Sequence, residues 1–192
     1  MSFGFALVLP DGVFVLADGR QVKPLAQDAI VSDEIDKVQL IHGKFALVPF
    51  GLTVATDVAL RVVRENWRPD TPPEEACRLV ERAVEQGWST ALCKLAADVD
   101  RTHPSLRCAL VGGGVLDGKR FVTATLVGFT SHDARTMDQT GSILQLGGED
   151  LNAPELARRD VQDAFDRHPY DVRNGPCNAT IAELVRLISA KL

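Results

Sequence analysis

Residues 2–20, SFGFALVLPDGVFVLADGR, predict how the fold begins. Apolar side chains alternate over residues 3–9 with the period of a strand. Pro10-Asp11-Gly12 then indicates a turn, because Pro fixes φ and Gly accepts a positive φ. The apolar run 13–17 would return beside the first strand. The chain is therefore predicted to open with a β-hairpin, with the hydroxyl side chain of Ser2 directly in front of it.

The remaining sequence predicts strands and helices in separate blocks. Residues 18–36 have the polar composition of a loop. Strands are predicted over 37–41, 45–48, 107–111, 120–127 and 142–146; helices are predicted over 52–67, from 74 to at least 86 and across Gly87 to 98, over 153–167, and from 180 to the end. Such blocks favour α+β layers over a wound parallel sheet. At 192 residues, a single domain over 1–192 is expected.

Composition and charge exclude several classes of function. The formal net charge is −5 and no basic tract occurs, so neither nucleic acid nor an anionic membrane surface is an expected partner. There is no apolar run of 18 residues, so no membrane crossing is predicted. Asp11 interrupts the early apolar run, which also lacks the features of a signal peptide. The four cysteines form no C-x-x-C pair, and we expect a reduced, cytoplasmic protein.

Several motifs resemble functional sites but are better explained as ordinary structural segments. The glycine-rich run 112–118 resembles a phosphate loop, but a hairpin strand and not a helix is predicted after it. Ser131-His132-Asp133 has the letters of a catalytic triad, yet adjacent residues cannot face one another, so a polar loop is expected. The four histidines lack the spacing of metal ligands, and no metal or other cofactor is predicted. Glu149-Asp150 and the acids at 33–36 are expected to be solvated.

Residues 2–52 resemble the start of a proteasome β subunit, a member of the N-terminal-nucleophile hydrolases. Ser2 matches the family's N-terminal nucleophile, and Asp18 and Arg20 match its acid and its arginine without a gap. Three additional loop residues then bring Lys37, in DKVQLI, onto the catalytic lysine. The same shift places Gly51, in VPFGL, on the glycine whose N–H helps to form the oxyanion hole. Further on, LVGGG at 110–114 resembles the end of the family's fifth strand.

This resemblance implies a four-layer αββα sandwich and amide hydrolysis through Ser2 once Met1 has been removed. The free α-amine, with a reference pKa of about 7.7–8.0, would take the proton of the Ser2 hydroxyl. The Lys37 ammonium would lower the pKa of that amine by like-charge repulsion and would pair with Asp18. Gly51 N–H would face the developing oxyanion.

The resemblance also implies roles around this centre. Arg20 would support Lys37 and the loop, and Pro49 would belong to the substrate pocket. The implied partners are a peptide or amide substrate and further copies of the chain, while an ATPase partner stays open. No cofactor is implied by this mechanism.

The sequence departs from the family's pattern in ways that keep other functions open. The nucleophile is Ser instead of Thr, and Gly147 or Gly148 stands where the family has a serine. The segment NATIAELVRLISAK resembles the family's fourth helix, so the sandwich is expected to be shortened at its C-terminus. The alternative is an inactive assembly or binding subunit of the same fold, in which Asp18, Arg20 and Lys37 form only an ion network. A non-peptide amidohydrolase is a third option.

Overall fold

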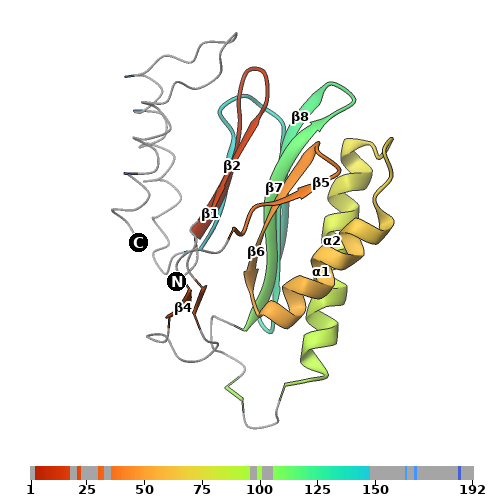
Figure 1. Cartoon of the computed structure of the whole chain (residues 1–192), viewed down its shortest axis with the longest axis vertical. Coiled ribbons are helices and arrows are strands. Elements are labelled where there is room, and N and C mark those ends of the chain that lie inside the picture. Colours follow the sequence, from red (N-terminus) through yellow and green to blue (C-terminus); the bar gives the residue numbers. More distant parts are fainter. Residues whose placement is uncertain are drawn as a thin grey trace.

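The computed structural model describes residues 3–17, 21–22, 30–32, 36–95, 99–100 and 106–147, together with Asp163, Arg167 and Arg186, which are helical. In this part of the chain, a pair of helices covers one face of a five-stranded sheet, and a three-stranded sheet packs on the opposite face (Figure 1). The α+β class is therefore confirmed for the described residues. The predicted C-terminal helices, 153–167 and 180 onward, lie outside them apart from those three positions.

The smaller sheet contains the hairpin predicted from residues 2–20. Its strand order is β10-β1-β2, with β1 at Phe3–Val8, β2 at Val13–Ala17 and β10 at Ile143–Gly147. The N–H of Leu9 donates to the carbonyl of Gly12 at 2.9 Å and closes the turn. Both neighbours of β1 are antiparallel to it, and Gly4 lies opposite Ala17. The opening hairpin is confirmed.

The larger sheet is an antiparallel series in chain order. It comprises β5 (Gln39–Ile41), β6 (Phe45–Gly51), β7 (Arg107–Leu116), β8 (Lys119–Gly128) and β9 (His132–Met137). Asp117 and Gly118, with φ of 50° and 72°, make the tight turn between β7 and β8. The glycine-rich run therefore lies inside a strand and its hairpin turn, as predicted, and does not form a phosphate loop before a helix.

The two helices are α1 (Thr53–Asn66) and α2 (Pro73–Leu92). They pack closely at Gly87, where a Cβ atom would lie 2.3 Å from the carbonyl oxygen of Ala55. Helix α2 continues through Gly87, as the apolar pattern predicted, but it ends at Leu92 instead of 98. The glycine is retained inside the helix because the backbone of α1 occupies the space that a side chain would need.

Each face of the larger sheet buries its own apolar core. One core lies under the helices, and its largest buried strand residues are Ile41, Phe45, Leu47, Leu110 and Phe121. The other lies between the two sheets and is formed by Ala6, Val8, Val48, Phe50, Ala109, Val111, Val122, Ala124 and Leu144. Because strand side chains alternate between faces, β6 and β7 contribute to both cores.

Strand β1 of the smaller sheet is also buried on its outer face. Ala6 and Val8 of β1 face the larger sheet, so Phe5 and Leu7 point away from it. Both side chains are nevertheless only 2% exposed, and Phe5 packs on the ring of Phe14 at 5.9 Å. A further layer on this face, as the predicted sandwich requires, is consistent with that burial and stays a prediction.

Three further sequence predictions need correction. Residues 18–36 are not wholly a loop, because β3 (Gln21–Val22) and β4 (Ile30–Ser32) pair within them. Residues 49–51 extend β6 and do not break it. The polar segment from His132 is the strand β9, although all of its side chains are exposed. It was missed because an edge strand without a buried face lacks the apolar alternation that identifies a strand.

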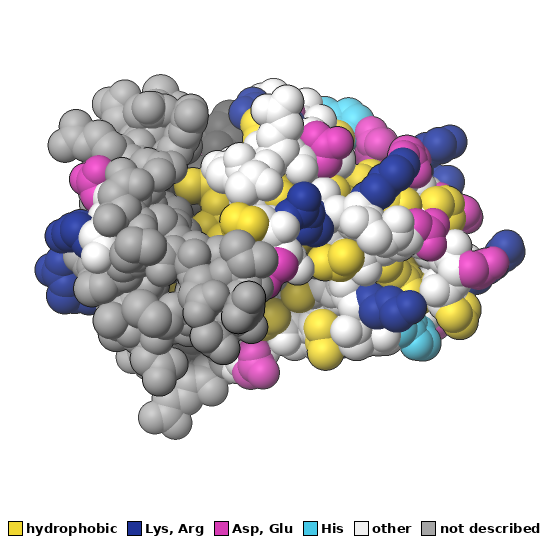
Figure 2. All heavy atoms as spheres, turned by 90° about the horizontal axis from the view of Figure 1, so that it is seen from above, with side chains coloured by type: hydrophobic (Ala, Val, Ile, Leu, Met, Phe, Trp, Pro, Cys, Tyr) yellow, Lys and Arg dark blue, Asp and Glu magenta, His cyan; other side chains and the backbone are white. Residues whose placement is uncertain are grey.

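The surface carries charges of both signs. On the face seen in Figure 2, acidic and basic side chains of the described residues alternate with small apolar areas. This mixture agrees with the absence of a basic tract in the sequence. In the described part of the chain, neither helix is both long enough and apolar enough to cross a membrane.

The core beneath the helices should dominate stability. Leu110 is fully buried, and Leu110→Ala should lower the free energy of unfolding by about 2–5 kcal/mol, because it leaves a cavity. Leu40→Ala is the matched control: its side chain is 63% exposed, and we expect a change within about 0.5 kcal/mol. Urea unfolding followed by circular dichroism measures both. Equal losses for the two variants would contradict this packing.

Candidate active site

Three of the six predicted site residues can be placed. Lys37 precedes β5, while Pro49 and Gly51 lie at the end of β6, shortly before α1. Ser2, Asp18 and Arg20 lie outside the described residues. Phe3 and Ala17, which are next in sequence to Ser2 and Asp18, are described and lie in the smaller sheet.

The start of β1 lies against the end of β6. A Cβ atom added to Gly4 would be 2.6 Å from Cζ of Phe50 and 3.3 Å from Cγ1 of Val48. Phe50 is 4% exposed and precedes Gly51 directly. Gly4 and Phe50, 46 positions apart in sequence, are therefore in contact across the space between the sheets. They belong to the two segments to which the resemblance assigns the nucleophile and the oxyanion hole.

The other two predicted segments reach the same space. Ala17, the last residue of β2, packs against the core between the sheets, and so does Val38, the residue after Lys37. Ala17 also lies opposite Gly4 in the sheet register. Four segments thus meet at one end of the inter-sheet core: the beginning of β1, the end of β2, the segment before β5 and the end of β6.

A local turn positions Lys37. The side chain of Asp36 accepts a hydrogen bond from the N–H of Val38 at 3.0 Å, which is the geometry of an Asx turn. The carbonyl of Asp36 accepts a further hydrogen bond from the Gln39 side chain at 3.3 Å. Asp36 is exposed, as expected of a solvated acid, and its two hydrogen bonds also shape this turn. Lys37, the residue between Asp36 and Val38 in sequence, is half-buried.

Gly51 has a conformation that other residues rarely adopt. Its φ is +98°, and a Cβ atom would lie 1.9 Å from the carbonyl oxygen of Arg107 on β7. The N–H of Leu52 donates to that same carbonyl at 2.9 Å as α1 begins. Glycine is needed here both for the positive φ and for the close approach of the neighbouring backbone.

The alternation of the β-ladder gives the direction of the Gly51 N–H group. In an antiparallel pair, every second residue bonds to the neighbouring strand. The carbonyl of Lys44 accepts from Val115 of β7, and counting in twos along β6 makes Phe50, opposite Ala109, a residue that also bonds to β7. Because the peptide unit is planar and trans, the N–H of Gly51 points opposite to the Phe50 carbonyl, away from β7. That side of β6 faces β5, whose ladder with β6 stops at Gln39 opposite Leu47. The Gly51 N–H group therefore points toward the side from which Asp36 and Lys37 approach.

Pro49 marks the place where this ladder ends. By the same alternation, the missing N–H of Pro49 is on the β5 side, beyond Gln39, where no pairing donor is required. Its half-buried side chain lies on the same face of β6 as Leu47, which packs beneath the helices. Assignment of Pro49 to a substrate pocket stays a prediction.

Arg107 is a charged neighbour that the sequence did not indicate. It begins β7, and its Cγ would lie 3.2 Å from a Cβ atom at Gly51. Burial lowers the pKa of its guanidinium from the usual value. No motif could have revealed it, because the contact joins residues 56 positions apart and depends on the β6–β7 register.

Comparison with models of known protein families and with curated proteins finds no match. Solved structures do match. A mutant of Anbu from Hyphomicrobium sp. strain MC1 has a TM-score of 0.56 and 18% identity over 98% of this chain and 71% of that chain. Anbu from Yersinia bercovieri, described as an ancestral β-subunit, gives 0.55 and 14% over 86% and 65%. A further structure of Anbu from Hyphomicrobium sp. strain MC1 gives 0.54 and 18% over 98% and 74%.

The fold is similar to that of Anbu. This similarity agrees with the predicted α+β fold. At these identities it establishes the fold and leaves the finer assignment to a β subunit, and the chemistry of each site residue, as proposals.

Replacing Gly51 tests the close approach to β7. Gly51→Ala should destabilise the protein more than Gly43→Ala does, by at least about 1 kcal/mol, because the new methyl group would clash with the Arg107 carbonyl. Gly43 is the matched control, since its φ is also positive, +72°, but nothing lies within 4 Å. Urea unfolding of both variants measures the difference. A Gly51→Ala protein as stable as Gly43→Ala would show that this approach is not tight.

Proposed function

We propose that the chain is a proteasome-like amide hydrolase that acts through Ser2 after removal of Met1. The observation that carries the proposal is the contact of Gly4 with Phe50, because it brings the start of β1 beside Gly51. Gly4 and Ala6 face the larger sheet. The same alternation, continued by one step, would direct the Ser2 side chain into the space between the sheets.

The proposed reaction begins with proton transfer from the Ser2 hydroxyl to its own α-amine. The serine oxygen then attacks the amide carbonyl, and the negative charge that develops on the carbonyl oxygen is stabilised by Gly51 N–H. Removal of such a donor typically costs about 2.7–4 kcal/mol of transition-state stabilisation. The amine returns the proton to the leaving nitrogen, and water releases the acyl group from Ser2.

Charged side chains would set the protonation of this centre. Lys37, placed by the Asp36 turn, would favour a neutral amine through its positive charge, and Asp18 would balance that charge. Arg20 would support the same ion network. Pro49 would border the pocket for the substrate side chain, at the position where the β5–β6 ladder ends.

Two substitutions test the nucleophile and the lysine. Ser2→Ala and Lys37→Ala should each reduce hydrolysis of a panel of fluorogenic peptide amides by at least about 100-fold, since each removes a group needed for proton transfer. Lys44→Ala, at an exposed lysine in the β5–β6 turn, should retain activity. An epoxyketone should modify Ser2 in the parent protein, detected by peptide mass spectrometry.

The outcomes separate the proposed enzyme from its alternative. Intact mass first reports whether Met1 has been removed. Activity that survives Ser2→Ala would refute the nucleophile assignment. A natively produced protein that retains Met1 completely and hydrolyses nothing would favour the inactive assembly or binding subunit.

We also propose that the chain assembles with copies of itself, with the 52–98 helices at a subunit contact. Val54 supports this, because it is an apolar side chain on α1 that is 47% exposed. Light scattering at micromolar concentration should give an oligomer, and Val54→Glu should weaken it, since the contact would have to bury a charge. Val115→Glu, on β7 and 39% exposed, is the control outside the helices. A monomeric parent protein would contradict the proposal.

A further inference from the structure

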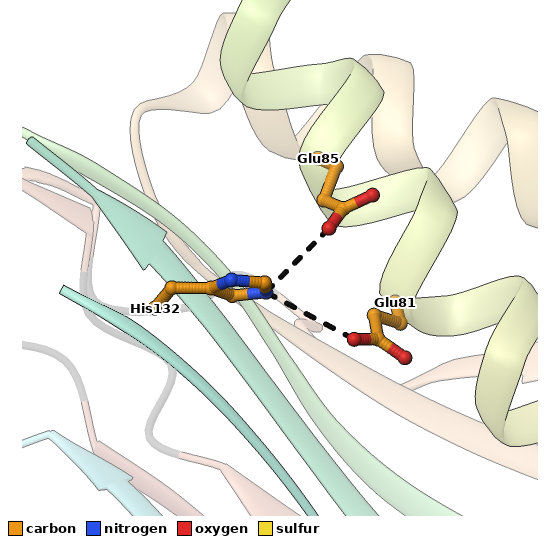
Figure 3. Close-up of side chains that lie close together, drawn as sticks. All are labelled: Glu81, Glu85 and His132. Carbon is orange, nitrogen blue, oxygen red and sulfur yellow. Dashed lines mark ion pairs between the residues drawn. The ribbon is translucent and has the colours of Figure 1, made fainter.

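A second group of chemically active side chains lies away from the candidate active site. Glu81 and Glu85 on α2 point toward His132 at the start of β9 (Figure 3). His132 Nε2 is 3.9 Å from Oε1 of Glu81 and 3.5 Å from Oε1 of Glu85. One potential ligand atom of each residue lies within 4.8 Å of the other two. The three side chains thus converge on one point from two elements.

Neighbouring contacts fix the position of this strand along the helix. The ring of Trp88 on α2 meets that of Phe129 edge-on at 5.1 Å, and Gly128 N–H donates to the Ser131 carbonyl at 2.8 Å. His132 follows directly. One turn before Glu81, the Cys77 thiol is hydrogen-bonded with Thr136, near the other end of β9. The helix and the edge strand are therefore held in register on both sides of His132.

The charges at this point favour a cation. Glu81 and Glu85 are one helical turn apart, and two like charges at this spacing repel each other. His132 adds a positive charge only when it is protonated. The basic residue of β9, Arg135, is already paired with Asp133 at 2.8 Å. A divalent ion between the three side chains would neutralise both carboxylates.

The donor set selects the class of ion. Two carboxylates and one imidazole suit Zn²⁺, which takes nitrogen and oxygen ligands at about 2.0–2.2 Å. Tetrahedral bonds of that length separate ligand atoms by about 3.3–3.6 Å, close to the present spacing. Ca²⁺ and Mg²⁺ prefer more ligands and oxygen alone. We propose that Glu81, Glu85 and His132 bind a divalent transition-metal ion, with Zn²⁺ as the best fit and a fourth coordination position left open.

Such an ion would connect β9 to the body of the fold. All side chains of β9 are exposed. In the described part of the chain, its hydroxyl hydrogen bonds with β8 all involve Thr123, which donates to the Arg135 carbonyl at 3.2 Å and accepts from the Thr136 hydroxyl at 3.3 Å. A bond from His132 through the metal to α2 would fix this edge to the helix pair. Binding of the metal ion should therefore raise the melting temperature of the protein.

Metal titration of the purified full chain tests the proposal. The protein is freed of metal with EDTA, exchanged into chelator-free buffer and titrated with Zn²⁺ by calorimetry; Co²⁺ absorption reports the ligand geometry. All proteins carry Cys93→Ser, which removes an exposed thiol that could bind zinc. We expect one Zn²⁺ per chain and a higher melting temperature. His132→Asn and Glu85→Gln should each weaken binding at least about tenfold.

Two matched controls make the result specific. Glu75→Gln changes an exposed acid on the same helix, and His42→Asn changes an exposed histidine in the β5–β6 turn. Both should bind Zn²⁺ within about twofold of the parent protein. Parent binding weaker than millimolar, or equal affinity in the parent and in His132→Asn, would overturn the proposal. Amide hydrolysis is not measured here, so failure of this site and failure of the Ser2 mechanism are distinguishable.

Discussion

The contact of Gly4 with the ring of Phe50 holds the two sheets together at the end where the candidate site lies. A side chain at residue 4 would meet that ring at 2.6 Å, so the sheets can approach this closely only because residue 4 has none. The contact brings the first strand over the end of β6. The beginning of α1, the Gly51 turn and the approach of Lys37 all lie at this end of the fold.

Backbone geometry at Gly51 links this contact to chemistry. The Arg107 carbonyl occupies the place of a Cβ atom, and the positive φ turns the chain from β6 into α1. The β6–β7 register then aims the Gly51 N–H away from β7. This one glycine thereby ends a strand, precedes a helix and presents a donor at the end of the inter-sheet core. This combination supports the proposed oxyanion contact.

The two proposed sites depend on different parts of the same sheet. The hydrolytic centre lies at β6, near one edge strand, whereas the proposed metal ligands join α2 to β9, the other edge strand. Edge strands leave backbone groups unpaired, and proteins protect them by cover, by charge or by assembly. A metal ion at His132 would restrain one edge, while contacts between copies of the chain would bury apolar side chains such as Val54.

The sequence by itself determined the opening hairpin, the two helices, the β7–β8 turn and the α+β class. These follow from local signals, namely apolar period, Pro and Gly positions and tight-turn residues, and each acts within a few neighbouring residues. Through the family resemblance, with three additional loop residues, the sequence also predicted site roles for Lys37 and Gly51, and these roles stay predictions. It missed β9, whose exposed side chains carry no apolar period.

Only the tertiary structure decided which distant residues meet. Arg107 reaches Gly51 through the β6–β7 register, and His132 reaches Glu81 and Glu85 because β9 lies along α2. No local pattern encodes either meeting, since the partners are separated by some 50 residues in sequence. The distances between these residues are fixed by the packing of two sheets and a helix pair around separate apolar cores. The secondary-structure propensities of the individual residues do not determine them.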